Sequence, residues 1–280
     1  MTEYTLSKNN ISDFARHLKA EERADGTIEK YLRDVSAFET WLAGKPVTKE
    51  LTALWKARLL RTHTPGTVNA MLASVNALFR FLGWEECRIK TLKLQRQMFR
   101  ASAKDLTQEE YSRLLSAARA LGRNRLFLLL ETICATGIRV SEVRYITVEA
   151  LHAGRSTVSL KGKSRAILIP GKLCRKLLKY AEKQKIVSGE VFLTRNGTGL
   201  SRKQIWAEMK ALCEKADVAP TKVFPHNLRH LFAKAFYKAC KDIVRLADVL
   251  GHSSIDTTRI YLLSTGAEHA RALERLGLIS

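Results

Sequence analysis

The stretch ATGIRVSE, residues 135–142, joins the predicted end of a helix to an arginine and a glutamate. The mainly apolar segment at residues 126–134, which begins with the apolar run 126–130, predicts the helix. Gly137 predicts its end, because glycine readily takes the left-handed conformation that commonly closes a helix. Arg139 and Glu142 are three residues apart, and such a pair often forms no more than an ion pair on a helix surface. This segment alone therefore does not assign a function to Arg139, and the motifs elsewhere in the chain are needed to do so.

Downstream of this segment lies a small β pattern. Residues 156–160 and 165–169 flank the turn KGKS at residues 161–164 and predict a short antiparallel hairpin. The GKS of this turn matches the end of a Walker A loop, but residue 157 is threonine where that loop requires glycine. We therefore expect a hairpin with a basic turn and no nucleotide site.

Two segments toward the end of the chain add histidine, arginine and tyrosine to this basic set. They are PHNLRH at residues 225–230 and LGHSSIDTTRIY at residues 250–261, with the candidate residues His226, Arg229, His252 and Tyr261. Arginine gives permanently charged, bidentate contacts to phosphate oxygens, and histidine and lysine can transfer protons. Tyrosine becomes a nucleophile when its proton is removed. This combination of side chains suits a reaction at a phosphodiester.

The same residues also have ordinary structural interpretations. His226 and His230 have the i, i+4 spacing of a zinc site, but the glutamate of the H-E-x-x-H motif is absent, so no metal is expected. We interpret His230 as a buried packing residue. His252 follows Gly251 and is also compatible with a simple helix end, and Tyr261 lies among apolar neighbours that are compatible with a core position.

The first part of the chain has the apolar spacing of a helical bundle. Apolar residues recur every three or four positions in three stretches, and a further segment joins two of them. These are residues 11–18, 28–42 and 68–82, with the segment 48–61 between the last two. Together they predict a compact bundle of about four helices.

A basic stretch without acidic residues follows the bundle. Its basic side chains include Arg88, Lys90, Lys93, Arg96 and Arg100. It is either a solvated linker or a strap that lies along the phosphates of a polyanion. The sequence TQEE at 107–110 then has the form of a capping box and begins a new helix. We expect a mainly α protein with a helical domain at 1–86, a basic linker at 87–103 and a second domain at 104–280 that contains the small sheet.

The charge of the chain favours a polyanionic partner. Its 280 residues contain 48 Lys and Arg against 27 Asp and Glu, for a net charge of +21. The hydrophobic content of 46% is that of a globular protein, so this charge belongs to a folded chain. No apolar run approaches the roughly 20 residues of a membrane span, and the N-terminus shows no signal sequence. The five cysteines lack disulfide or metal spacing, so we expect a cytoplasmic protein.

In this order and at these spacings, the motifs resemble those of the tyrosine recombinases, the phage-integrase and Xer-like family of site-specific recombinases. The family motifs A-T-G-x-R-x-S-E, H-x-L-R-H and L-G-H-S occur intact at residues 135–142, 226–230 and 250–253, and Tyr261 follows them. The resemblance covers both domains. It implies a SAM-like helical core-binding domain followed by a mainly α-helical catalytic domain with a small antiparallel β-sheet.

The resemblance also implies which residues carry out the reaction. The implied catalytic residues are Arg139, Lys161, His226, Arg229, His252 and Tyr261. Lys161 matches the lysine-glycine pair of the family's hairpin turn. The turn is shorter than the common G-K-G-x-K-x-R form, so Lys163 is the alternative to Lys161. The five basic residues of the linker are expected to bind DNA.

The activity implied by the resemblance is cleavage and rejoining of double-stranded DNA through a 3′-phosphotyrosyl intermediate and a Holliday junction, without metal, ATP or another cofactor. The family acts as a homotetramer on paired DNA sites. Residues 266–278 are then the candidate helix that docks on a neighbouring protomer, and accessory DNA-bending or directionality factors are candidate partners in the nucleoid. The alternatives are a type IB topoisomerase-like enzyme and a catalytically silent DNA-binding regulator.

Overall fold

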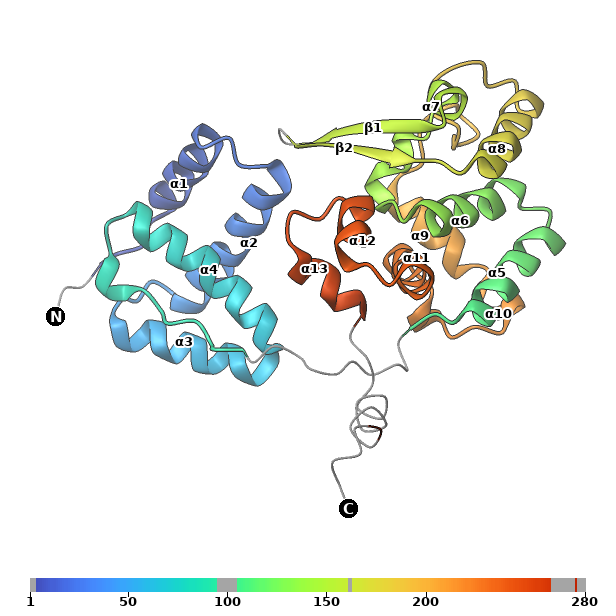
Figure 1. Cartoon of the computed structure of the whole chain (residues 1–280). Helices are drawn as coiled ribbons and strands as arrows, with labels where there is room; N and C mark the ends of the chain where they lie inside the picture. Colours follow the sequence, from blue (N-terminus) through green and yellow to red (C-terminus); the bar gives the residue numbers. More distant parts are fainter. Residues whose placement is uncertain (1–3, 95–104, 161–162, 263–274, 276–280) are drawn as a thin grey trace. The chain divides into compact units, whose positions relative to one another are not determined.

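The computed structural model describes residues 4–94, 105–160, 163–262 and residue 275. The chain divides into two compact units, residues 1–96 and 97–280. Both are mainly helical, and the second contains a two-stranded antiparallel sheet (Figure 1). The predicted fold class is confirmed. Within the described ranges, no helix is long and apolar enough to span a membrane.

The first unit is built around a bundle of α-helices. Those of its described part are α1 (Lys8–Ala20), α2 (Asp25–Leu42), α3 (Lys49–Thr62) and α4 (Pro65–Phe81). Thr48 and Thr64 begin α3 and α4, because each hydroxyl accepts a hydrogen bond from a backbone N–H of the first turn. The apolar stripes meet in a core where Phe38 packs edge-on against Trp55 and Phe79.

The segment after the bundle is fastened to α4 rather than free. The side-chain amide of Asn76 accepts from the N–H of Ile89 and donates to its carbonyl, both at 2.8 Å. Asn69, two helical turns earlier, binds the backbone of Leu92 in the same way at 2.7 and 2.9 Å. Ile89 is also buried in the core of the first unit. The sequence predicts a linker from residue 87 onward, whereas the structure packs residues 88–92 onto the first unit.

The basic side chains of this segment differ in their surroundings. Lys90 and Lys93 are exposed, whereas Arg88 forms an ion pair with Glu85. Lys56 of α3 donates a hydrogen bond to the carbonyl of Lys90 at 2.7 Å, which also holds the segment in place. Arg96 and Arg100 lie outside the described residues.

The second unit places a hairpin and a set of helices around a large hydrophobic core, and a smaller cluster lies between α11, α12 and the segment at Tyr261. Its helices in the described ranges are α5 (Gln108–Ala120), α6 (Asn124–Thr136), α7 (Val148–Ala153), α8 (Gly171–Lys183), α9 (Arg202–Lys210), α10 (Cys213–Ala216), α11 (Pro225–Cys240), α12 (Ile243–Leu250) and α13 (Ile255–Arg259). The predicted hairpin is present as β1 (Arg155–Leu160) and β2 (Lys163–Leu168), paired from Arg155 opposite Leu168 to Leu160 opposite Lys163.

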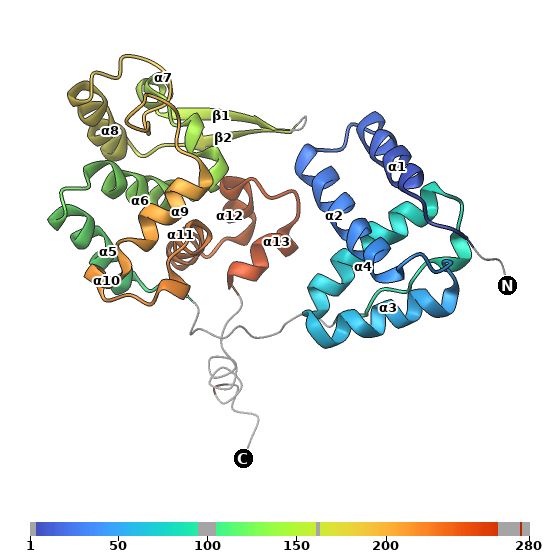
Figure 2. The ribbon, with the colours of Figure 1, turned by 180° about the vertical axis from the view of Figure 1, so that it is seen from behind.

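Helix α6 lies at the centre of this unit. Leu129, Leu130 and Ile133 on it are fully buried, and α5, α8 and α11 pack against it. Both views of the ribbon show α6 and α11 side by side (Figures 1 and 2). The helix ends where predicted, at Gly137 with φ +63°, and a Cβ added there would lie 2.4 Å from Phe232 of α11. Glycine therefore permits both the left-handed helix end and the close approach of α11.

Candidate active site

Arg139 stands directly after the end of α6 and is anchored to Glu142. Its backbone N–H donates to Oε2 of Glu142 at 2.7 Å, and its Nη1 donates to Oε1 at 2.9 Å. The Glu142 side chain is only 1% exposed, whereas that of Arg139 is 43% exposed. The ion pair that the spacing suggested is therefore present. Its carboxylate is buried, whereas its guanidinium is accessible to solvent.

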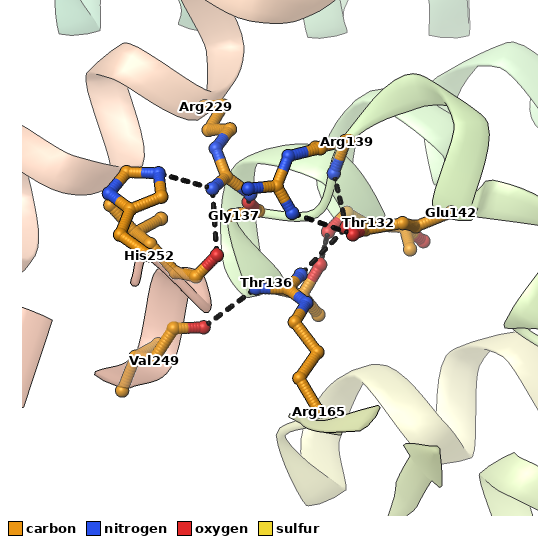
Figure 3. A network of polar contacts seen from close by, with 10 residues as sticks. Thr132, Thr136, Gly137, Arg139, Glu142, Arg165, Arg229, Val249 and His252 are labelled. Atoms are coloured by element: carbon orange, nitrogen blue, oxygen red, sulfur yellow. Dashed lines mark hydrogen bonds and ion pairs between the residues drawn. The ribbon is translucent and has the colours of Figure 1, made fainter. Parts of the chain in front are cut away.

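Arg229 of α11 is almost completely buried and joins three segments of the chain (Figure 3). Its Nη1 donates to the carbonyl of Gly137 at the end of α6, and its Nη2 donates to the carbonyl of Leu250 at 2.8 Å. The same Nη2 contacts Nε2 of His252 at 2.9 Å. Burial lowers the pKa of Arg229, and its hydrogen bond with Tyr261 opposes that shift. The arginine is thus a fixed positive charge beside both His252 and Tyr261.

His252 is held between an arginine and a hydroxyl. Its Nδ1 lies 2.8 Å from Oγ1 of the fully buried Thr258, opposite the contact of Nε2 with Arg229. Arginine has only donors, so Nε2 accepts and the ring proton lies on Nδ1. Burial, followed by the charge of Arg229, lowers the pKa of His252 to about 4. The imidazole is therefore neutral near pH 7.

Tyr261 lies in a short 3₁₀ helix after α13 and is 5% exposed. Three histidine rings surround it. The ring centre of Tyr261 is 5.6 Å from that of His226, 5.0 Å from that of His230 and 5.7 Å from that of His252. His252 stacks on the tyrosine with an interplanar angle of 9°, whereas His230 meets it edge-on. His230 is 3% exposed, as expected for a packing residue.

One of the six catalytic candidates, the hairpin lysine, is not among the described residues. Lys161 lies outside the described residues, and the backbone of Lys163 pairs with Leu160 at the end of the hairpin. The segment 266–278 lies outside the described residues except for residue 275. Five of the six candidates are thus described, and they converge from the segment after α6, from α11, from the turn after α12 and from the 3₁₀ helix at Ile260–Leu262. In the described ranges, no group of three or more His, Cys, Asp and Glu side chains could hold a metal ion.

Sequence comparison identifies the scaffold that carries this cluster. Residues 104–268 match the phage integrase family, and residues 11–86 match the phage integrase N-terminal SAM-like domain. The chain belongs to the phage integrase family. The matches confirm the predicted family, and with it the prediction of a tyrosine recombinase.

The similarity of this phage integrase family member to known recombinases covers nearly its whole length. It is 29% identical to tyrosine recombinase XerA of Pyrococcus furiosus, covering 100% of this chain and 98% of that one. It is 30% identical to tyrosine recombinase XerD of Brucella suis, covering 90% and 91%. A solved lambda integrase tetramer bound to a Holliday junction has 18% identity and a TM-score of 0.74, covering 93% and 78%. That structure has the same fold.

Two residues of the candidate active site were missed by sequence reasoning. Arg165 on β2 lies opposite Val158, which is buried, and two residues before the buried Ile167. Strand alternation could have revealed it, because it puts a charged residue on the inward face of the hairpin. Thr258 carries no such signal, since a threonine in a short helix is common and its contact with His252 exists only in the folded chain.

Proposed function

We propose that this chain is a site-specific DNA recombinase in which Tyr261 cleaves one strand of a duplex and holds its end covalently. The phenolic oxygen attacks the phosphorus atom, a bond from phosphorus to that oxygen forms, and the bond to the 5′-oxygen breaks. A 3′-phosphotyrosyl bond and a free 5′-hydroxyl result. The observation that carries the proposal is the convergence of Arg229, His252 and His226 on the Tyr261 ring.

The two arginines would neutralise the phosphate in the transition state. Arg229 is preorganised, because the carbonyls of Gly137 and Leu250 fix its guanidinium in a buried position. A charge fixed in this way stabilises developing negative charge without reorganisation during the reaction. Arg139 is exposed and would bind a non-bridging oxygen from the solvent side.

The proton transfers are assigned to the other side chains. His226 is exposed beside Tyr261 and would assist removal of the phenolic proton. His252 would donate a hydrogen bond to a phosphate oxygen from Nε2 once its proton is on that nitrogen rather than on Nδ1. Lys161 at the hairpin turn would protonate the leaving 5′-oxygen, with Lys163 as the alternative.

Rejoining would follow when a 5′-hydroxyl of a partner strand attacks the phosphotyrosine. The phosphodiester bond energy is conserved in the covalent intermediate, so the scheme requires no ATP. Two rounds of exchange would pass through a Holliday junction, with double-stranded DNA and a homotetramer on paired sites as the partners. The net charge of +21 supports binding to such a polyanion. Accessory DNA-bending or directionality factors are further candidate partners.

Recombination is favoured over the alternatives. The chain matches XerA along its whole length, including the N-terminal SAM-like domain, which supports recombination over a type IB topoisomerase. Retention of arginine, histidine and tyrosine at one site supports an enzyme over a catalytically silent DNA-binding regulator.

The experiment uses a duplex selected for binding from a random DNA library and nicked near its centre. Cleavage traps the covalent adduct because the short fragment diffuses away, and the adduct is visible on a denaturing gel. The wild type should form it, and Tyr261→Phe should bind the duplex without forming it. Tyr237→Phe, in the same apolar cluster, is the matched control and should react normally. An adduct that persists in Tyr261→Phe would reject the proposal.

A further inference from the structure

Arg165 connects the hairpin to both sides of the candidate active site (Figure 3). Its Nη2 donates to Oε2 of Glu142 at 2.7 Å, and its Nη1 donates to the carbonyl of Val249 at 3.2 Å. The side chain is 13% exposed. A Cβ added to Gly251 would lie 2.2 Å from Cδ of Arg165, so the arginine also packs directly against the turn that leads to His252.

The carboxylate of Glu142 is shared between two arginines. Arg139 binds Oε1 with Nη1, and Arg165 binds Oε2 with Nη2. A carboxylate that is 1% exposed needs such partners, because an unpaired buried charge costs several kcal/mol. Together the two arginines and the glutamate carry one net positive charge, which faces solvent through Arg139.

The partners of Oε2 of Glu142 determine how many N–H groups of the Arg139 guanidinium remain available to a phosphate. A guanidinium and a carboxylate prefer a bidentate pair with two parallel hydrogen bonds. Oε2 accepts from Nη2 of Arg165 and from the backbone N–H of Arg139, so in the described part of the chain the Arg139 side chain binds the carboxylate through Nη1 alone. The rest of the Arg139 fork stays free for a phosphate oxygen.

We propose that Arg165 is a positioning residue of the reaction: it holds the second oxygen of Glu142, which keeps the Arg139 fork open for the scissile phosphate. This inference rests on the proposed function. Through Val249 and Gly251, the same side chain connects strand β2 of the hairpin to the turn that leads to His252. Loss of Arg165 lets Glu142 capture Arg139 in a bidentate pair and loosens that tie.

The experiment measures DNA affinity and the single-turnover cleavage rate at saturating concentrations of the selected, nicked duplex. Arg165→Met should lower the cleavage rate by about ten- to a hundredfold, because small misplacements of a catalytic group have effects of that size. DNA affinity should change little. Arg165→Lys keeps a charge next to Glu142 and should recover part of the rate. Arg155→Met on β1 is the matched control, since Arg155 is exposed and, among the described residues, its side chain makes no hydrogen bond or ion pair, although its backbone pairs with Leu168.

A double-mutant cycle separates positioning from other roles. Arg139→Lys replaces the fork with a single ammonium that cannot form the bidentate pair, so Arg165→Met should cost much less rate in that background. Additive losses would overturn the inference. So would a lower affinity with a flatter salt dependence, which would mean that Arg165 binds DNA directly.

A purely structural role also has a distinct outcome. Parallel losses of melting temperature, affinity and rate, with no recovery in Arg165→Lys, would overturn the inference. If Arg165→Met fails to fold, Arg165→Lys alone decides. Lysine cannot contact Glu142 and Val249 together as the Arg165 guanidinium does, so a wild-type rate in that folded variant would contradict the inference. The proposed function is tested separately, by whether the wild type forms an adduct that depends on Tyr261. If the wild type is active and Arg165→Met cleaves DNA at the same rate, only this inference is rejected.

Discussion

Nη2 of Arg229 lies 2.9 Å from Nε2 of His252, and this contact determines where the imidazole proton resides. Because a guanidinium only donates, the proton lies on Nδ1 and faces Oγ1 of Thr258. To donate to a phosphate oxygen, His252 must carry the proton on Nε2 instead. A hydroxyl can accept from Nδ1–H or donate to a bare Nδ1, so Thr258 can satisfy both tautomers.

Thr258→Val should therefore slow DNA cleavage while leaving DNA binding nearly unchanged. Valine has the shape of threonine but can neither donate nor accept, and loss of one hydrogen bond of about 1.4 kcal/mol corresponds to roughly tenfold in rate. Thr258→Ser retains the hydroxyl and should stay close to the wild type. Single-turnover cleavage of the nicked duplex is the measurement. A wild-type rate in Thr258→Val would show that the tautomer of His252 does not depend on this contact.

The lowered pKa of His252 should make part of the stability depend on pH. The pKa is about 4 in the folded chain against 6.5 for the free side chain. Between these values the unfolded chain binds a proton that the folded chain does not, so stability falls as pH falls from about 6.5 to about 4. Urea unfolding at several pH values should show a shallower decline for His252→Asn than for the wild type. Identical slopes would contradict the assignment.

Gly137→Ala should destabilise the second unit more than Gly122→Ala does. Both glycines have positive φ, +63° and +64°, so both variants lose about 1–2 kcal/mol from left-handed backbone strain. Only at Gly137 would the new Cβ meet Phe232, at 2.4 Å, which adds about 1–3 kcal/mol of overpacking. Thermal and urea unfolding of both variants checks this difference. Equal losses would mean that α11 can shift without cost.

Neutralising Lys90, Lys93 and Arg96 together should weaken binding to specific and random DNA alike. Lys90 and Lys93 are exposed on the segment that Asn69 and Asn76 of α4 hold in place. Basic side chains on such an extended segment are suited to contact DNA phosphates rather than base edges. Removal of one cation from a phosphate should reduce the salt slope of log K by about 0.9. Titrations at several salt concentrations measure the slope on both duplexes. Loss of discrimination with an unchanged slope would show base reading instead.

Local sequence was sufficient for the four helices of the first unit, for α5 and α6, for the hairpin and for the family motifs. The C-terminal end of α6 follows from Gly137 and the start of α5 from the capping box at Thr107, and both signals depend on residues within a few positions. The pattern of β1 and β2 is local in the same sense. Short motifs with fixed spacing also named the arginines, histidines and tyrosine that the fold brings together.

Only the tertiary structure decided which groups share a site and how they are held. Arg165 reaches Val249 across 84 positions in the chain, and Arg229 reaches Gly137 across 92. No periodicity encodes such contacts, because they depend on how α11 and α12 pack against α6 and the hairpin. The same holds for the backbone of Ile89 and Leu92, which two asparagines of α4 fix to the first unit where composition indicated a linker. Composition reports the charge of that segment, whereas the partners of its backbone are set by packing.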